Sequence, residues 1–238
     1  MKNLLVLPIL ALSFGVTDSA IAGTMGPDVT LKNWTGFYAG ANGGAGLATA
    51  ASSISGAGGT GSLSTASHEL NGFLAGGQAG YNYQRENLLI GLEGEGNWTN
   101  IQGIAPCVLF LSCNANLRWT ADASARLGVL PTNSLLVYVK GGVAWTGVDY
   151  NLSSIAGIFG GTTVISSNLS TTKTGGLLGI GTEYLLAPHW TTKIEYNYAD
   201  YGSPTNTFVI TGASTSINLP VSTKLQMHGI KVGVNYLI

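Results

Sequence analysis

Hydrophobic and polar residues alternate without interruption from Leu117 to Val129. Every odd-numbered residue in this stretch is apolar, and every even-numbered residue is polar or glycine. Because neighbouring side chains of a β-strand point to opposite faces, this period of two predicts a long strand with one apolar and one charged face. Two settings suit such a strand: a β-sandwich whose polar face meets water, or a membrane β-barrel whose apolar face meets lipid.

The same alternation recurs along the chain. It predicts strands at about residues 34–46, 72–83, 88–98, 117–129, 135–150, 173–186 and 190–200, and a last strand that ends at residue 238. The connections alternate between long (47–71, 99–116, 151–172, 202–222) and short (85–87, 131–134, 187–189). Long external loops with tight periplasmic turns are typical of outer-membrane barrels, whereas a Greek-key sandwich has no reason to sort its loops in this way. The sequence therefore predicts an all-β fold, an eight-stranded antiparallel up-and-down transmembrane β-barrel.

The first residues predict export. Lys2 is followed by an apolar run and then by Ala20-Ile21-Ala22, which together indicate a secretory signal peptide that is cleaved after Ala22. We expect a signal peptide at 1–22, a short periplasmic segment at 23–33 and a barrel domain at 34–238. After the signal peptide, no stretch approaches the ~20 consecutive apolar residues of a spanning helix. The expected location is the cell outer membrane.

Composition narrows the function classes. The net charge of −1 argues against a nucleic-acid partner, and 35 glycines argue against a helical protein. Cys107 and Cys113 lie between two predicted strands, and in an exported chain this spacing predicts a small surface disulfide.

The polar strand faces are expected to meet in the barrel lumen. An eight-stranded barrel is just wide enough for side chains to fill its interior, and a buried charge must be paired or hydrogen-bonded. We expect Glu183 directly opposite Lys193, and Asp122 diagonal to Lys140. The sequence therefore predicts a plugged, ion-paired lumen. The expected lumen charges are Glu93, Glu95, Arg118, Asp122, Arg126, Lys140, Lys173, Glu183, Lys193, Glu195 and Lys231. The alternative is a narrow water path beside the inward glycines Gly40, Gly44, Gly76 and Gly80.

Aromatic residues gather near the ends of the predicted strands. Amphipathic rings at both edges of an apolar band form an aromatic girdle, although aromatic residues also flank strands in soluble proteins. The expected girdle consists of Tyr81, Tyr83, Trp98, Trp119, Trp145, Tyr184, Trp190, Tyr198 and Tyr236.

Short motifs follow one another along almost the whole mature chain. They are WTGFYAG (34–40), GQAGYN (77–82), GLEGE (91–95), RLG (126–128), GTEY (181–184), WTTKIEY (190–196) and HGIKVGVNY (228–236). In this order they resemble the small outer-membrane β-barrel proteins of alphaproteobacteria, the Omp25/Omp31-type porin family related to opacity proteins. The resemblance implies an eight-stranded outer-membrane barrel, a role in envelope integrity, loops exposed at the surface and, in some members, binding of haem or host factors.

The resemblance also suggests partners. We expect outer-membrane lipid and lipopolysaccharide around the barrel, the barrel-assembly machinery during biogenesis, and a host or surface ligand at the loops as a further option. Family members usually end in Phe, which the assembly machinery reads, whereas this chain ends in Ile238.

Three functions fit these observations. We favour a non-enzymatic barrel with a structural role in the envelope and at most limited small-solute permeability. The alternative is a surface recognition module, an adhesin or a haem- or host-factor-binding protein, that uses its four extracellular loops. A lipid A-modifying enzyme is disfavoured, because Ile230 rather than Ser stands two residues from His228 on the lipid-facing side. The residues therefore predict no catalytic, cofactor-binding or metal site.

Overall fold

The computed structural model describes residues 33–55, 62–108, 111–153, 167–203, 205–211 and 216–238. Only the backbone is described at 52–55, 62–68, 104–108, 111–115, 150–153, 167–169, 205–211 and 216–223. The expected signal peptide at 1–22 and residues 23–32 lie outside the described residues, so these boundaries stay predictions. In the described part of the chain, no helix has the length and apolar character needed to cross a membrane.

The described residues form nine β-strands in a single sheet. They are β1 (Gly36–Ser55), β2 (Ser62–Arg85), β3 (Leu88–Val108), β4 (Leu111–Thr132), β5 (Leu135–Ser153), β6 (Ser167–Ala187), β7 (Trp190–Asp200), β8 (Thr205–Thr211) and β9 (Ser216–Leu237).

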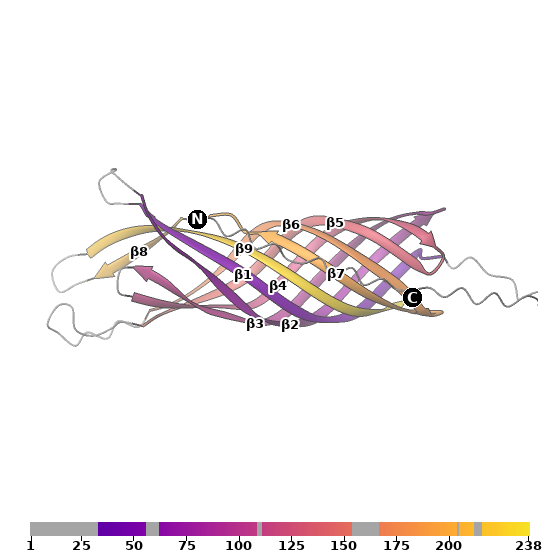
Figure 1. The fold of residues 1–238 in the computed structure, drawn as a ribbon, viewed down its shortest axis with the longest axis horizontal. Coiled ribbons are helices and arrows are strands. Elements are labelled where there is room, and N and C mark those ends of the chain that lie inside the picture. Colours follow the sequence, from indigo (N-terminus) through magenta and orange to yellow (C-terminus); the bar gives the residue numbers. More distant parts are fainter. Residues whose placement is uncertain (1–32, 56–61, 109–110, 154–166, 204, 212–215) are drawn as a thin grey trace, which may run out of the picture. The chain divides into compact units, whose positions relative to one another are not determined.

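The sheet closes on itself. Consecutive strands from β1 to β7 pair antiparallel, β7 pairs with β9, and β9 pairs back with β1 (Figure 1). Among the described strands, β8 pairs with β9 alone and stands outside this ring. The ring is therefore a closed eight-stranded antiparallel barrel, and the predicted fold class is confirmed.

The strands are much longer than the alternation predicted. A tilted transmembrane strand needs about 9–11 residues, yet the strands other than β7 and β8 have between 19 and 24 residues. The predicted loops at 47–71, 99–116 and 202–222 were therefore wrong over most of their length, and the one at 151–172 was wrong at its ends, 151–153 and 167–172. On the external side the inward face is itself apolar, with Leu70, Ile101 and Leu225 buried there, so inward and outward residues no longer differ in polarity and the period of two is lost. The three predicted short turns are confirmed, at Glu86–Asn87, Asn133–Ser134 and Pro188–His189.

One predicted lumen charge lies on the outer surface. Arg118 has 67% of its side chain exposed and pairs with Asp149 at 3.1 Å, whereas Leu117, expected outward, is fully buried in the lumen. The register of β4 against β5 shifts between Leu117 and Trp119. A β-bulge adds one residue to a strand, and because the side-chain period is two, the faces exchange beyond it. The alternation is therefore correct from Trp119 onward and wrong for the two residues before it.

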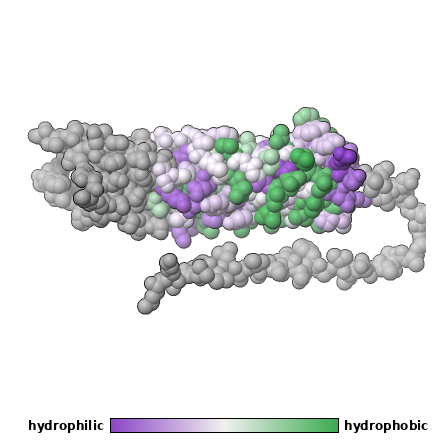
Figure 2. Space-filling model, turned by 90° about the horizontal axis from the view of Figure 1, so that it is seen from above, coloured by the Kyte–Doolittle hydropathy of each residue, from purple (hydrophilic) through white to green (hydrophobic). Residues whose placement is uncertain are grey.

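Apolar side chains cover the outside of the barrel. Figure 2 shows them as green patches toward the end that carries the short turns, bordered there by hydrophilic residues. All nine expected girdle residues occupy outward-facing strand positions. Tyr81, Tyr83, Tyr184, Trp190 and Tyr236 lie toward the short turns, and Trp98, Trp119, Trp145 and Tyr198 lie farther along their strands. Their contact with the edges of the bilayer stays a prediction.

Candidate functional site

The inward faces of the strands bring a set of charged side chains together inside the barrel. Alternate residues of one strand share a face, so Glu93 lies beside Glu95 on β3, and Lys193 lies beside Glu195 on β7. Each member of the set is at most 9% exposed. We call these nine residues the lumen network: Glu93, Glu95, Asp122, Arg126, Lys140, Glu183, Lys193, Glu195 and Lys231. Lys173, which was also expected in the lumen, is buried on β6 nearer the external end of that strand.

Arg126 is a fully enclosed cation of the lumen network, with 1% of its surface exposed. Its guanidinium donates from Nη2 to Glu183 Oε2 at 2.7 Å and from Nη1 to Glu93 Oε2 at 3.3 Å. Its Cζ atom lies 5.3 Å from the ring centre of Tyr38 and 4.1 Å from that of Tyr138, within cation–π range of both rings. Two carboxylates and two aromatic rings therefore hold this side chain in one position.

The lysines of the network each contact several carboxylates. Lys140 Nζ lies 2.9 Å from Glu195 and 3.2 Å from Glu93. Lys193 Nζ lies 3.3 Å from Glu93. Lys231 contacts Glu95, and its Nζ lies 3.3 Å from Glu195. Because the strands that carry these residues stand on different sides of the barrel, the contacts cross the lumen and connect its walls.

The expected pairs are partly realised. Glu183 and Lys193 are directly opposed in the β6–β7 register, as predicted. Among the described ion pairs, however, Glu183 binds Arg126, and Lys193 binds carboxylates on β3 and β7. The Asp122–Lys140 pair forms at 3.7 Å, but the predicted diagonal register was wrong, because Asp122 stands opposite Ala144 and Lys140 stands opposite Arg126. Register in a sheet fixes which backbones are neighbours, but long side chains in a narrow barrel also reach partners on non-adjacent strands.

Amide side chains fill the part of the lumen next to β1 and β2. Asn42 donates to Gln78 at 2.7 Å, Gln78 donates to Asn235 at 2.6 Å, and Asn235 donates to Glu183 at 2.7 Å. This chain of hydrogen bonds links inward residues of β1 and β2 to the lumen network. These hydrogen bonds were not predicted from the sequence, because only charged residues were considered for the lumen. Gln78 and Asn235 nevertheless stand at predicted inward positions.

Apolar side chains flank the lumen network on both sides. Trp34, just before β1, is 1% exposed and packs with Leu89, Leu130, Leu136 and Tyr138 at the short-turn end. Its Nε1 donates to the carbonyl oxygen of Asn133 at 3.2 Å. A second apolar cluster occupies the external side and includes Leu70, Leu74, Ile101, Leu117, Val148, Leu177, Leu225 and Met227. We call this second cluster the external apolar layer.

The inward glycines make room for large side chains. A Cβ atom built on Gly80 would lie 2.6 Å from Cζ of Tyr38, and one built on Gly181 would lie 2.6 Å from Cζ of Tyr138. The two tyrosines therefore occupy the space that these glycines leave. The hypothesis of a water path beside Gly80 is not supported at this position.

The histidines and cysteines form no further site in the described residues. The Tyr196 hydroxyl lies 2.7 Å from His228 Nδ1 on the outer face, and His189 Nδ1 lies 2.9 Å from the carbonyl oxygen of Leu237. The side chains of His68, Cys107 and Cys113 lie outside the described residues, so the disulfide stays a prediction.

At the external end of β7, a small polar cluster lies beyond the aromatic Tyr198. The backbone N–H of Gly202 and the amide of Gln226 donate to the Asp200 carboxylate at 2.8 and 2.9 Å. These hydrogen bonds favour the charged form and hold the pKa of Asp200 below its usual value. They also tie the end of β7 to β9.

Comparison with known proteins agrees with the fold and the sequence motifs. Residues 9–236 match the outer membrane protein beta-barrel domain family. The chain is 29% identical over 239 residues to the 31 kDa outer-membrane immunogenic proteins of Brucella melitensis and Brucella suis, covering 93% of this chain and 90% of each relative. Among solved structures, OprG of Pseudomonas aeruginosa is 14% identical with a TM-score of 0.49 and covers 87% of this chain and 99% of its own. Ail of Yersinia pestis is 14% identical with a TM-score of 0.34 and covers 80% of this chain and 97% of its own. The resemblance indicated by the motifs is confirmed, and the chain belongs to the outer membrane protein beta-barrel domain family and resides in the outer membrane.

Proposed function

We propose that this protein is a non-enzymatic barrel that supports the outer membrane structurally and passes small solutes at most to a limited extent. The observation that carries this proposal is the lumen network, in which Lys140 contacts both Glu93 on β3 and Glu195 on β7 across the lumen. A solute that crosses the barrel has to separate these ion pairs. Separation of a buried pair is costly, because each charge is left without a partner in a low-dielectric interior.

The apolar clusters support the same proposal. Trp34 and its neighbours lie on one side of the lumen network, and the external apolar layer lies on the other. General diffusion requires the wider barrels of about 16–18 strands, in which an aqueous channel remains after the side chains are placed. If the lumen is closed, the barrel contributes to the envelope as a rigid body in the membrane with a surface exposed to the outside, and not as a channel.

Single-channel recording in planar lipid bilayers tests the closed lumen. The refolded mature protein is expected to give no stable large conductance steps, while a general porin of about 16 strands in the same lipids serves as the positive control. Heat-modifiable mobility on gels shows that the inserted protein is folded. Stable large steps from the folded monomer would overturn the proposal.

The non-enzymatic part of the proposal has its own test. His228 is exposed on the outer face and bonded to Tyr196, which fits a rim histidine at headgroup depth. Lipid A from a strain that lacks the gene should show the same acyl pattern in mass spectrometry as lipid A from the parent. A changed pattern that the wild-type gene restores would establish a lipid-modifying activity.

A surface recognition role is the second candidate, and the strand lengths favour it. Seven strands have at least 19 residues, so their external halves continue well beyond the span that a bilayer requires. The Brucella relatives are named as immunogenic outer-membrane proteins, which fits exposed external segments. Deletion of residues 154–166 tests this role. Lost cell adhesion or ligand binding with retained folding would support recognition, and unchanged binding after deletion of each external loop in turn would refute it.

A further inference from the structure

The bulge in β4 turns one arginine to the outer surface of the barrel. The register of β4 against β5 shifts between Leu117 and Trp119, so that Leu117 is buried in the lumen while Arg118 has 67% of its side chain exposed. Bulges of this kind are frequent next to functional sites, where they re-aim a side chain. The surroundings of Arg118 on the outer face therefore bear on function.

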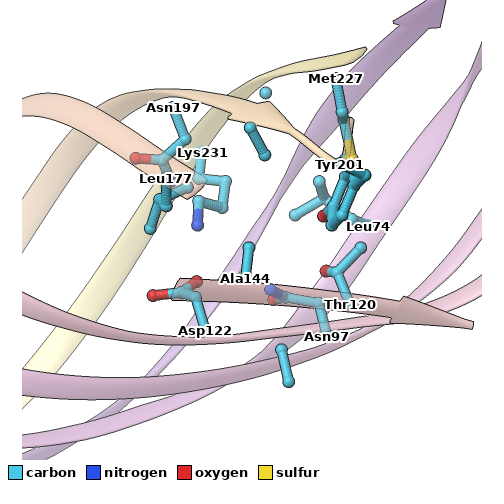
Figure 3. Close-up of a pocket in the computed structure, with 13 residues that line it drawn as sticks. Leu74, Asn97, Thr120, Asp122, Ala144, Leu177, Asn197, Tyr201, Met227 and Lys231 are labelled. Carbon is cyan, nitrogen blue, oxygen red and sulfur yellow. The ribbon is translucent and has the colours of Figure 1, made fainter. Parts of the chain in front are cut away.

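The inward side of the bulge favours a leucine and excludes an arginine. Leu117 belongs to the external apolar layer. Figure 3 shows Leu74, Leu177 and Met227 of this layer, which line a pocket at the external side of the lumen network. A guanidinium among apolar side chains is costly, because it loses its hydration. The bulge therefore keeps the apolar residue inside and places the charge outside.

Strands β5 and β6 hold Arg118 in place on the outer face. Its Nη1 donates to Asp149 Oδ2 at 3.1 Å, and the Ser170 hydroxyl donates to Asp149 Oδ1 at 2.6 Å. Both oxygens of this carboxylate thus have a donor. A guanidinium has five N–H groups, of which the described contacts of Arg118 use one. The side chain is therefore fixed at one edge and presents its other donors to a ligand.

An indole ring lies beside this ion pair, on the side toward the apolar band. Trp119 follows Arg118 in β4, and its ring covers Gly147 of β5, where a Cβ atom would lie 2.8 Å from Cδ1 of the indole. Trp145, Gly147 and Asp149 share the outward face of β5, because alternate residues of a strand point to one side. The Trp119 ring and the Arg118 guanidinium therefore occupy successive positions along the outside of the same strand.

The place of this row along β5 indicates its depth in the membrane. Trp145 is the eleventh residue of β5, counted from Leu135 beside a short turn, and a tilted strand crosses a bilayer in about 9–11 residues. The indole rings then stand where hydrocarbon meets the lipid headgroups, as the rings of an aromatic girdle do. Asp149 lies farther along the strand, so the ion pair is at the level of the headgroups of the external leaflet.

We propose that Arg118 and Trp119 bind a phosphorylated glycolipid of the external leaflet, with a phosphate on the guanidinium and the apolar part of the lipid against the indole ring. Arginine makes charge-assisted, often paired hydrogen bonds to phosphate oxygens, and these are stronger than neutral ones. Asp149 cancels part of the charge, so the attraction depends on these direct hydrogen bonds. A free phosphate ion has no apolar part to place on the ring, which favours a lipid as the source. The site goes beyond the function proposed above, because it lies on the outer face and does not depend on a closed lumen.

Native mass spectrometry tests the binding of the lipid. The mature protein, folded in detergent micelles, is mixed with lipid A that carries its phosphates or with the same lipid after their enzymatic removal. We expect the ratio of lipid-bound to lipid-free protein to be about tenfold higher for the phosphorylated lipid, which is the size of effect that hydrogen bonds to a charged group give. Equal binding of the two lipids would overturn the proposal. Displacement of the lipid by inorganic phosphate would show that the site takes the free ion instead.

A pair of variants tests the contact itself. Arg118→Gln should lower the binding of phosphorylated lipid A about tenfold and leave the binding of the dephosphorylated lipid unchanged. Arg85→Gln is the matched control, because it removes the same charge from an exposed residue beside the short turn after β2 and should bind both lipids as the wild type does. A loss that is the same for both lipids, or the same in both variants, would refute the contact between Arg118 and a phosphate.

Photolabelling of the wild-type protein covers the case in which Arg118→Gln does not fold. Phosphorylated lipid A with a photoreactive diazirine on an acyl chain is added in an equimolar amount, and the labelled peptides are identified by mass spectrometry. The label is expected in the peptides that contain Trp119 or Trp145. Labelling confined to other parts of the barrel would overturn this location.

Discussion

Arg126 and Lys140 face each other directly across the β4–β5 ladder, so that two buried cations occupy opposed positions of the sheet. Like charges in such positions repel each other. Both side chains contact Glu93, Arg126 at 3.3 Å and Lys140 at 3.2 Å. Lys193 contacts the same carboxylate at 3.3 Å. Glu93 is therefore the shared counterion of three cations from three strands.

Replacement of Glu93 should destabilise the barrel strongly. Glu93→Gln keeps the shape but removes the charge, and the loss of one partner from a buried ion pair costs about 3–5 kcal/mol. The measurement is urea unfolding of the refolded protein in detergent. Glu86→Gln, in the exposed turn between β2 and β3, is the matched control and should change stability by less than about 0.5 kcal/mol. Equal stability of the two variants would contradict the importance of the lumen network.

Alanine should lower the free energy of unfolding at one glycine of β6, Gly181, and should not lower it at another, Gly176. At Gly181 a Cβ atom would lie 2.6 Å from Tyr138, whose ring contacts Arg126 and whose hydroxyl donates to Glu195 at 2.8 Å. Gly181→Ala should therefore cost about 1–3 kcal/mol through overpacking.

Gly176 is the control for this substitution. It faces outward on the same strand, and a Cβ atom there meets no heavy atom within 4 Å. Gly176→Ala should be neutral or stabilise by up to about 1 kcal/mol, because alanine reduces the freedom of the unfolded chain. Thermal unfolding, followed by circular dichroism, measures both variants. A tolerated alanine at Gly181 would show that the lumen is less densely filled than the structure indicates.

The depth of a residue in the bilayer should determine how much an introduced charge on β9 lowers the free energy of unfolding. Val232 faces outward midway between His228 and Tyr236, and Val232→Arg should cost about 2–4 kcal/mol in phospholipid vesicles. Ile238 lies at the edge of the barrel, where arginine should cost about 0–1 kcal/mol. Urea titration compares the two variants.

Spin labels at Ala123 and Val232 should report a lipid environment. A water-exposed label at either position would show that the membrane-spanning band lies elsewhere on the barrel.

The two cysteines should form a disulfide in the exported protein. The backbone pairs Ala105 with Cys113 and Pro106 with Ser112, so Cys107 lies close in register to Cys113 on the neighbouring strand. We expect no alkylation of the folded or urea-unfolded protein before reduction and modification of both thiols after it, measured by mass spectrometry. Cys107→Ser should leave one thiol that reacts without reductant. Alkylation of the unreduced wild-type protein would show that the bond is absent.

Side-chain contacts were harder to predict from the sequence than the fold. Strand positions and the short turns followed from alternation, because a residue that meets lipid on one face and the lumen on the other must differ from its neighbours. The bulge beside Arg118 could not be predicted from alternation. An extra residue in a strand leaves the residue pattern unchanged, but it moves the side chains before it to the opposite face of the sheet. The external halves of the strands were not predicted either, because their inward residues, such as Leu70 and Ile101, are apolar and therefore do not alternate with polar ones.

The sequence by itself determined that the chain forms an eight-stranded barrel, which face of each predicted strand points outward, and which charges enter the lumen, apart from Leu117 and Arg118 on β4. The tertiary structure alone decided which charges meet, because partners such as Lys140 and Glu195 belong to strands that are not neighbours in the sheet. Closure of the barrel brings such side chains within reach, and their positions then depend on which neighbours fill the same narrow space. The packing of Tyr38 and Tyr138 against Arg126 arises in this way.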